Sequence, residues 1–269
     1  MTPMTDPLPP ALADYYIALD DGRMADAAGS FALDACFAGP APAVIETDPR
    51  ILTVGRDQIQ ARFEGRGPRP DVHDVLVCIV DGSSCLLEGV SRDGTTGDAL
   101  QSFVASAQLD DDGLVARYLA FAATSVIAPS AAPAHCSTDA LGLLDEYFRA
   151  LDVGDFDTAA GCFSEDTLYS HPPYKHTGLD GFARVEFASR QELLDAFRAR
   201  GKASFDHRIV AGAQRGAHCL VEGVVENLPA SASHRTGSFI SNLTLDADGL
   251  IRRYASFYCE PGVPRAERV

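Results

Sequence analysis

Basic residues are scarce in this sequence of 269 residues, and they form no run. Lysine and arginine together number 22 against 38 aspartates and glutamates, which gives a formal net charge of −16 at pH 7. Nucleic-acid-binding proteins normally carry a basic face that displaces counterions from phosphates, and anionic membrane surfaces attract the same kind of face. The sequence therefore predicts no nucleic-acid partner and no membrane partner.

Long apolar stretches are also missing, since no run approaches the ~18–20 residues of a membrane span. The opening MTPMTDPLPP lacks the basic and apolar regions of a signal peptide. The seven cysteines are odd in number and form no C-x-x-C pair, which is typical of free, mostly buried thiols in a reducing compartment. Together these features predict a cytoplasmic protein.

Motifs for cofactors are lacking as well. The sequence has no glycine-rich phosphate loop, no G-x-S-x-G and no nucleotide-binding motif. His171 and His176, taken with His207, do not have the spacing of a known metal site. We therefore expect neither a metal nor a cofactor.

The sequence contains an internal repeat, with two copies of one unit. YYIALDDGRMADAAGSF at Tyr15 returns as YFRALDVGDFDTAAGCF at Tyr147, and LDDDGLVARYLAF at Leu109 returns as LDADGLIRRYASF at Leu245. The offset between the copies grows from 132 residues (147 minus 15) to 136 (245 minus 109). A period this long indicates a duplicated domain, because solenoid repeats run ~20–50 residues.

The repeat predicts two domains separated by a linker rich in proline, alanine and serine. The expected boundaries are a disordered leader over 1–10, a first copy over 11–126, the linker over 127–138, a second copy over 139–262 and a tail over 263–269.

Within each copy, helical patterns precede strand patterns. In the second copy, apolar spacing predicts a helix around 143–151, a short helix over 156–163, and a third helix from Ser189, which has capping-box spacing with Glu192. The alternating segments FDHRIVAG, CLVEGVVEN, SFISNLTL and LIRRYASFY predict three or four antiparallel strands, and D-D-D-G and D-A-D-G predict hairpin turns. This order is α+β.

Several motifs together suggest a family. Y-F-x-A-L-D-x-G-D-F, a Phe-Ser-Glu-Asp segment, Y-S-H-P-P-Y and a closing L-x-x-D-G-L-I-x-R-Y-x-x-F resemble the nuclear transport factor 2-like superfamily, nearest to SnoaL-like polyketide cyclases and ketosteroid isomerases. The resemblance implies two tandem cone-shaped domains, each with N-terminal helices packed on a curved antiparallel sheet around an apolar pocket. Because such proteins commonly dimerise through their sheets, it also implies an intrachain pseudo-dimer and leaves a further homodimer open.

The resemblance also implies site residues. Ketosteroid isomerases use a tyrosine on the first helix, a carboxylate that moves the proton, and a strand acid that holds the oxyanion. These positions fall on Tyr147, on His171, and on Ser241 or Asn242. Neither of the last two positions carries a carboxylate, but histidine can shuttle protons near neutral pH, and serine, asparagine and tyrosine can donate to an oxyanion. We expect these four residues to be catalytic.

Other side chains are candidates for a substrate pocket, although core packing is the alternative for the aromatic ones. His207 has an equivalent in His73 of the first copy, which favours a structural or pocket-wall role. The expected substrate-binding residues are Tyr169, Tyr174, His207, Tyr254 and Phe257.

The first copy lacks the catalytic set, because Gly39 stands where His171 does and Ala105 stands opposite Ser241. We therefore expect the first copy to be degenerate and the second to be the functional half.

Both copies keep a glutamate in an apolar strand, Glu88 and Glu222, and an arginine, Arg117 and Arg253. A glutamate in such a strand usually pairs, so buried ion pairs between these residues are predicted.

The sequence thus favours a cofactor-independent isomerase or cyclase that moves protons on a hydrophobic, carbonyl-bearing small molecule. A non-catalytic binding protein for an apolar metabolite is the alternative, and a structural or scaffolding module is a third. Converging histidine, tyrosine and asparagine side chains would favour the enzyme, whereas an entirely apolar cavity would favour the binder.

Overall fold

The computed structural model describes residues 5–39, 52–123, 126–127, 133, 136–172, 184–228, 236–259 and 262–263. These residues form two units with the same order of helices and strands. The first unit comprises α1 (Pro10–Asp20), α2 (Met24–Gly29), β1 (Phe31–Ala38), β2 (Thr53–Val54), α3 (Arg56–Arg66), β3 (Asp71–Asp81), β4 (Ser84–Asp93), β5 (Ala99–Leu109) and β6 (Val115–Ala122). The second comprises α4 (Ala140–Val153), α5 (Phe156–Gly161), β7 (Phe163–His171), β8 (Val185–Phe187), α6 (Arg190–Arg200), β9 (Asp206–Arg215), β10 (His218–Glu226), β11 (Gly237–Leu245) and β12 (Ile251–Cys259).

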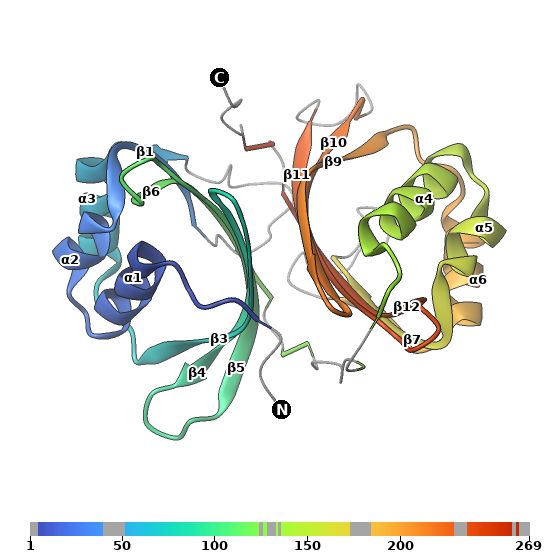
Figure 1. Ribbon diagram of the computed structural model, residues 1–269, viewed down its shortest axis with the longest axis horizontal. Helices are drawn as coiled ribbons and strands as arrows, with labels where there is room; N and C mark the ends of the chain where they lie inside the picture. Colours follow the sequence, from blue (N-terminus) through green and yellow to red (C-terminus); the bar gives the residue numbers. More distant parts are fainter. Residues whose placement is uncertain are drawn as a thin grey trace.

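Each unit is one curved sheet with helices on one face, as Figure 1 shows. The strand orders are β2-β1-β6-β5-β4-β3 and β8-β7-β12-β11-β10-β9, so the two sheets are equivalent strand for strand. The predicted tandem α+β architecture is confirmed. The sheets are mixed rather than wholly antiparallel, because β1 runs parallel to β6 and β7 runs parallel to β12. Parallel neighbours need a long crossover, and most of each unit lies between the two strands of these pairs.

Local signals place the ends of several elements. The Asp139 side chain accepts hydrogen bonds from the first turn of α4, and Ser189 accepts one from the Glu192 backbone at the start of α6. The two predicted hairpin turns are present and alike. Asp110 and Asp246 each accept two backbone N–H bonds within their own turn, and each turn ends on a glycine with positive φ.

The two sheets face each other across the centre of the molecule, with the helices outermost (Figure 1). Apolar side chains from both units close one part of this interface, and the rings of Phe121 and Phe257, which are equivalent residues, lie 6.4 Å apart. A second cluster joins Val77, Ile79 and Leu86 to Ala213 and Leu220. The chain thus forms the expected intrachain pseudo-dimer.

Two crossed ion pairs lie in the same interface. Arg117 donates to Glu222 at 2.6 and 3.1 Å, and Arg253 donates to Glu88 at 2.5 and 3.3 Å. All four residues are at least nine-tenths buried. The buried pairs expected from the sequence exist, and each one joins a residue of one copy to a residue of the other.

The segments that follow the last strand of each copy repeat this symmetry. The backbone N–H of Ile127, after β6, donates to Ser102, and that of Val263, after β12, donates to the equivalent Ser238. Asp6, in the segment expected to be a leader, accepts from the Val80 backbone at 2.8 Å and pairs with Arg215 of the second copy. None of the helices in the described ranges is long and apolar enough to cross a membrane.

Replacing Glu222 with glutamine tests how much the buried ion pairs contribute to the free energy of unfolding. Glu222→Gln leaves the buried Arg117 without its counter-charge, which should lower the free energy of unfolding by about 3–5 kcal/mol. Urea unfolding measures the loss. Arg149 pairs with Asp145 on the exposed face of α4, so Arg149→Gln should cost no more than about 0.5 kcal/mol. Equal losses in the two variants would contradict a dominant role for the buried pair.

Candidate functional site

An aromatic cluster fills the second copy between α4 and the sheet. Tyr147 comes from α4, where it is 1% exposed, and its hydroxyl lies 3.3 Å from the Tyr169 hydroxyl. The Tyr169 ring stacks on Tyr254 at 5.1 Å, and Tyr147 meets Tyr254 edge to face at 5.7 Å. Three tyrosines expected in the site from sequence are therefore brought together, each from a different element.

Ser241 adds hydroxyl contacts to this cluster from β11. Its Oγ lies 2.9 Å from the Tyr254 hydroxyl and 3.1 Å from the Ser256 Oγ. Ser241 and Ser256 are direct neighbours across the β11–β12 ladder, so their side chains emerge on the same face as Tyr254. The inner face of the second sheet thus carries a network of hydroxyl groups inside an apolar wall.

His171 closes β7 beside this network, with its ring parallel to Tyr169 at 6.2 Å. Its Nδ1 lies 2.6 Å from the Pro172 carbonyl, which can only accept, so Nδ1 carries the proton. Burial lowers the pKa of His171 to about 3, and the nearby charges of Arg184 and Arg200 act in the same direction. His171 is therefore a neutral imidazole at physiological pH.

His207, at the start of β9, is held by Asp152 at the end of α4. Its Nδ1 lies 2.7 Å from Asp152 Oδ1, and its backbone N–H donates to Oδ2 at 2.8 Å. The ring stacks on Phe148 at 4.7 Å and meets Phe239 at 5.9 Å. The Phe239 ring crosses Gly223, where an added Cβ would collide with it. Because two contacts to one carboxylate fix this imidazole, Asp152 sets its orientation.

Two expected site residues lie elsewhere. Asn242 follows Ser241 and therefore points to the opposite face of β11, where its Oδ1 accepts from Arg253 at 3.2 Å. Phe257 likewise faces the other copy, packs against Phe121, and lies under the Arg184 guanidinium at 4.7 Å. The structure does not bring either side chain to the hydroxyl cluster, because the alternation of a strand puts both in the interface between the copies.

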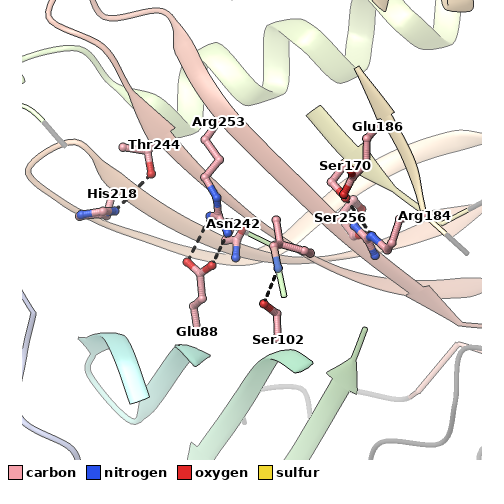
Figure 2. Close-up of polar contacts among 11 residues, drawn as sticks. Glu88, Ser102, Ser170, Arg184, Glu186, His218, Asn242, Thr244, Arg253 and Ser256 are labelled. Atoms are coloured by element: carbon pink, nitrogen blue, oxygen red, sulfur yellow. Dashed lines mark hydrogen bonds and ion pairs between the residues drawn. The ribbon is translucent and has the colours of Figure 1, made fainter. Parts of the chain in front are cut away.

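Figure 2 shows this outer face, with Asn242 and Arg253 together and Arg184 beside Ser170 and Ser256. Tyr174 lies outside the described residues, as does His176.

The first copy keeps part of the arrangement. His73 lies 2.6 Å from Asp20, as His207 does from Asp152, and Tyr16 and Tyr118 share a 2.8 Å hydroxyl contact. Burial raises the pKa of the Tyr16 and Tyr118 hydroxyls. In place of the serine pair, however, this copy has Ala105 and Ala120 on neighbouring strands, and Phe37 replaces Tyr169. Among the described residues, the serine part of the hydroxyl network therefore belongs to the second copy alone, while the first copy keeps a tyrosine pair.

Sequence reasoning missed Asp152 and Ser256. A signal for Asp152 was available, because both copies hold the aspartate of the A-L-D segment together with the histidine of the later strand. No such signal marked Ser256, which is recognisable only once its pairing with Ser241 is known.

In the part of the chain that the structure describes, no three histidine, cysteine, aspartate or glutamate side chains gather as a metal site. The seven cysteines are free thiols, and Cys78 and Cys85 lie within 3.5 Å of each other.

Comparison with known proteins agrees with this architecture. Residues 144–254 match the family model for the SnoaL-like domain. Residues 144–254 therefore form a SnoaL-like domain. The first half repeats its elements, so the chain is a tandem duplication. No curated protein matches the sequence.

Solved structures with a similar fold each correspond to about half of the chain. A nuclear transport factor 2-like protein of unknown function from Burkholderia xenovorans is 15% identical, with a TM-score of 0.36, and the match covers 48% of this chain and 94% of that one. A candidate polyketide cyclase from Sinorhizobium meliloti is 20% identical, with a TM-score of 0.33, over 42% and 94%. A candidate ketosteroid isomerase from Kribbella flavida is 19% identical, with a TM-score of 0.34, over 48% and 87%.

The half-buried, neutral His171 should make the stability of the fold depend on pH. Its pKa in the folded protein, about 3, lies below the ordinary value of 6.5, so the unfolded chain binds more protons between these values. The contribution is therefore complete above pH 6.5 and is lost as the pH falls toward 3. Between pH 7 and pH 5 the loss should be about 1–2 kcal/mol.

Urea unfolding of the wild type and His171→Gln at pH 7, 6 and 5 measures this effect. The variant should decline less steeply, because glutamine takes up no proton. Parallel declines in the two proteins would show that His171 is not buried as a neutral group.

Proposed function

We propose that the second copy is an isomerase- or cyclase-type enzyme that transfers protons on a hydrophobic, carbonyl-bearing small molecule without a cofactor. The observation that carries the proposal is that an oriented imidazole and a cluster of hydroxyl donors belong to the same inner face of the second sheet. His207 is fixed by Asp152 and stacks on Phe148, whose ring lies 5.1 Å from that of Tyr147 in the hydroxyl cluster.

His207 is the proton carrier in this scheme. Its Nδ1–H donates to Asp152, which leaves Nε2 as the nitrogen that accepts a proton from the carbon next to the substrate carbonyl. The electrons of the broken C–H bond move onto the carbonyl oxygen and form an enolate. Where a carbon–carbon double bond adjoins the enolate, return of the proton to the far carbon of the dienolate isomerises the substrate. Where the enolate carbon attacks a second carbonyl, a ring closes and the alkoxide that forms takes the proton back from His207.

The hydroxyl groups serve the developing oxyanion. Tyr147 and Tyr254 donate from an apolar setting, where a hydrogen bond to a charged oxygen is worth more than in water. Ser241 accepts from or donates to Tyr254 and so orients that hydroxyl. These groups replace the strand acid of the ketosteroid isomerases, which the chain lacks.

His171 has a different role in this scheme from the acid/base role that the family resemblance implies. With a pKa near 3 it is a weak base and holds no second proton at neutral pH. We assign it a positioning role beside Tyr169, whose ring it parallels. The proton-carrying role passes to His207, which the sequence placed in the pocket wall.

Deuterium exchange tests the proposal without knowledge of the natural substrate. Proton transfer next to a carbonyl would incorporate deuterium from D2O into simple apolar ketones such as 2-decalone and 4-tert-butylcyclohexanone, which mass spectrometry follows. His207→Gln should slow protein-catalysed exchange ~10²–10⁴-fold, because it removes the positioned base.

The first copy supplies the matched control. His73→Gln removes the equivalent imidazole and the equivalent bond to an aspartate, so its structural cost is similar. This variant should retain the exchange rate. Equal loss in both variants would assign the histidine–aspartate pairs to stability alone.

A binding protein for an apolar metabolite is the second candidate. Tyr147 is 1% exposed and is surrounded by aromatic rings, which favours binding of a ligand over its chemical conversion. Under this alternative, the ketones would broaden the NMR signals of the protein and raise its melting temperature, yet the wild type would catalyse no exchange.

A further inference from the structure

The crossed ion pairs connect the copy that lacks the serine pair to the copy that has it. Glu88 reaches from β4 of the first copy to the Arg253 guanidinium on β12 of the second, as Figure 2 shows. Arg253 also donates to Asn242 on the neighbouring strand β11. One carboxylate of the first copy therefore holds an arginine that ties β11 to β12.

These same two strands carry the candidate site on their other face. Arg253 directly precedes Tyr254, and Asn242 directly follows Ser241. Because neighbouring residues of a strand point to opposite faces, the Arg253–Asn242 contact lies behind the Tyr254–Ser241 contact. Fixing the outer pair fixes the backbone from which the inner pair projects.

The equivalent contact in the first copy lies behind Tyr118, whose hydroxyl contacts Tyr16, and no serine pair adjoins it. Arg117 pairs with Glu222, and the residue equivalent to Asn242 is Ser106, which donates to Glu222 at 2.6 Å. On the inner face of these strands, Ala105 and Ala120 stand where the second copy has serines. The two ion pairs are alike in burial and geometry, but only the Arg253 pair lies behind a tyrosine joined to two serines.

We propose that Glu88 is a positioning residue for the site of the second copy and acts across the interface through Arg253. The first copy thus completes the second, which is a reason for the chain to retain it. The inference takes the site from the proposed function, but the strand geometry on which it rests does not depend on catalysis.

The duplication provides a matched pair of variants for the test. Glu88→Gln and Glu222→Gln each remove one carboxylate from an equivalent buried pair, so their structural costs should be similar. NMR spectra of the protein with isotope-labelled histidine and tyrosine report on the surroundings of His171, His207 and Tyr254. Glu88→Gln should shift the Tyr254 and His171 signals beyond their line widths, whereas Glu222→Gln should leave them in place.

Two results would overturn the proposal: unchanged signals in both variants, or equal shifts in both, which would mean general loosening of the interface. If an unpaired arginine prevents folding, Glu88→Leu/Arg253→Leu and Glu222→Leu/Arg117→Leu remove the charge and keep the comparison, because apolar replacement of a buried pair is tolerated.

Deuterium exchange separates this proposal from the proposed function. If the wild type catalyses exchange, Glu88→Gln should slow it about 10-fold or more, and Glu222→Gln should not, because misplaced groups react slowly. Absent exchange in the wild type with the spectral contrast intact would overturn the function alone. Retained exchange in Glu88→Gln without spectral contrast would overturn the positioning role alone.

Discussion

The molecule depends on two buried ion pairs that cross between its halves. A guanidinium and a carboxylate taken out of water each cost several kcal/mol unless they meet, so Arg117 needs Glu222 and Arg253 needs Glu88. Each arginine reaches its glutamate only if the two sheets face each other in one relative position. The apolar clusters around Phe121 and Phe257 give the interface its area, and the ion pairs fix how the copies are aligned.

This alignment links the two faces of each sheet. The strand that offers Arg253 to the first copy offers Tyr254 to the interior of the second, and the alternation of side chains makes the two inseparable. With Glu88 in its proposed positioning role, a copy without the serine pair can still support the site of the other copy. The first copy has Ala105 and Ala120 where the second has Ser241 and Ser256.

Much of the fold could be predicted from the sequence. The repeat gave the number of domains, the spacing of Leu144, Tyr147 and Leu151 gave a helix, and the Asp-rich turns gave hairpins, because these features depend on residues close together in the chain. The site was predicted in part. Tyr147, Tyr169, Tyr254 and Ser241 do meet, whereas Asn242 and Phe257 face the other copy. Period-two alternation says that neighbouring residues differ in face, but it does not say which face is the interior.

The sequence by itself determined that the protein is a tandem α+β duplication with matched glutamates and arginines, since periodicity, caps and turns are local and repeat in both copies. Only the tertiary structure decided how those charges pair. Glu88 and Arg253 are 165 positions apart, and Glu222 and Arg117 are 105 apart. No local rule connects residues at such separations. The choice of a partner in the opposite copy follows from the packing of one sheet on the other, which brings the charges within bonding distance and excludes water from them.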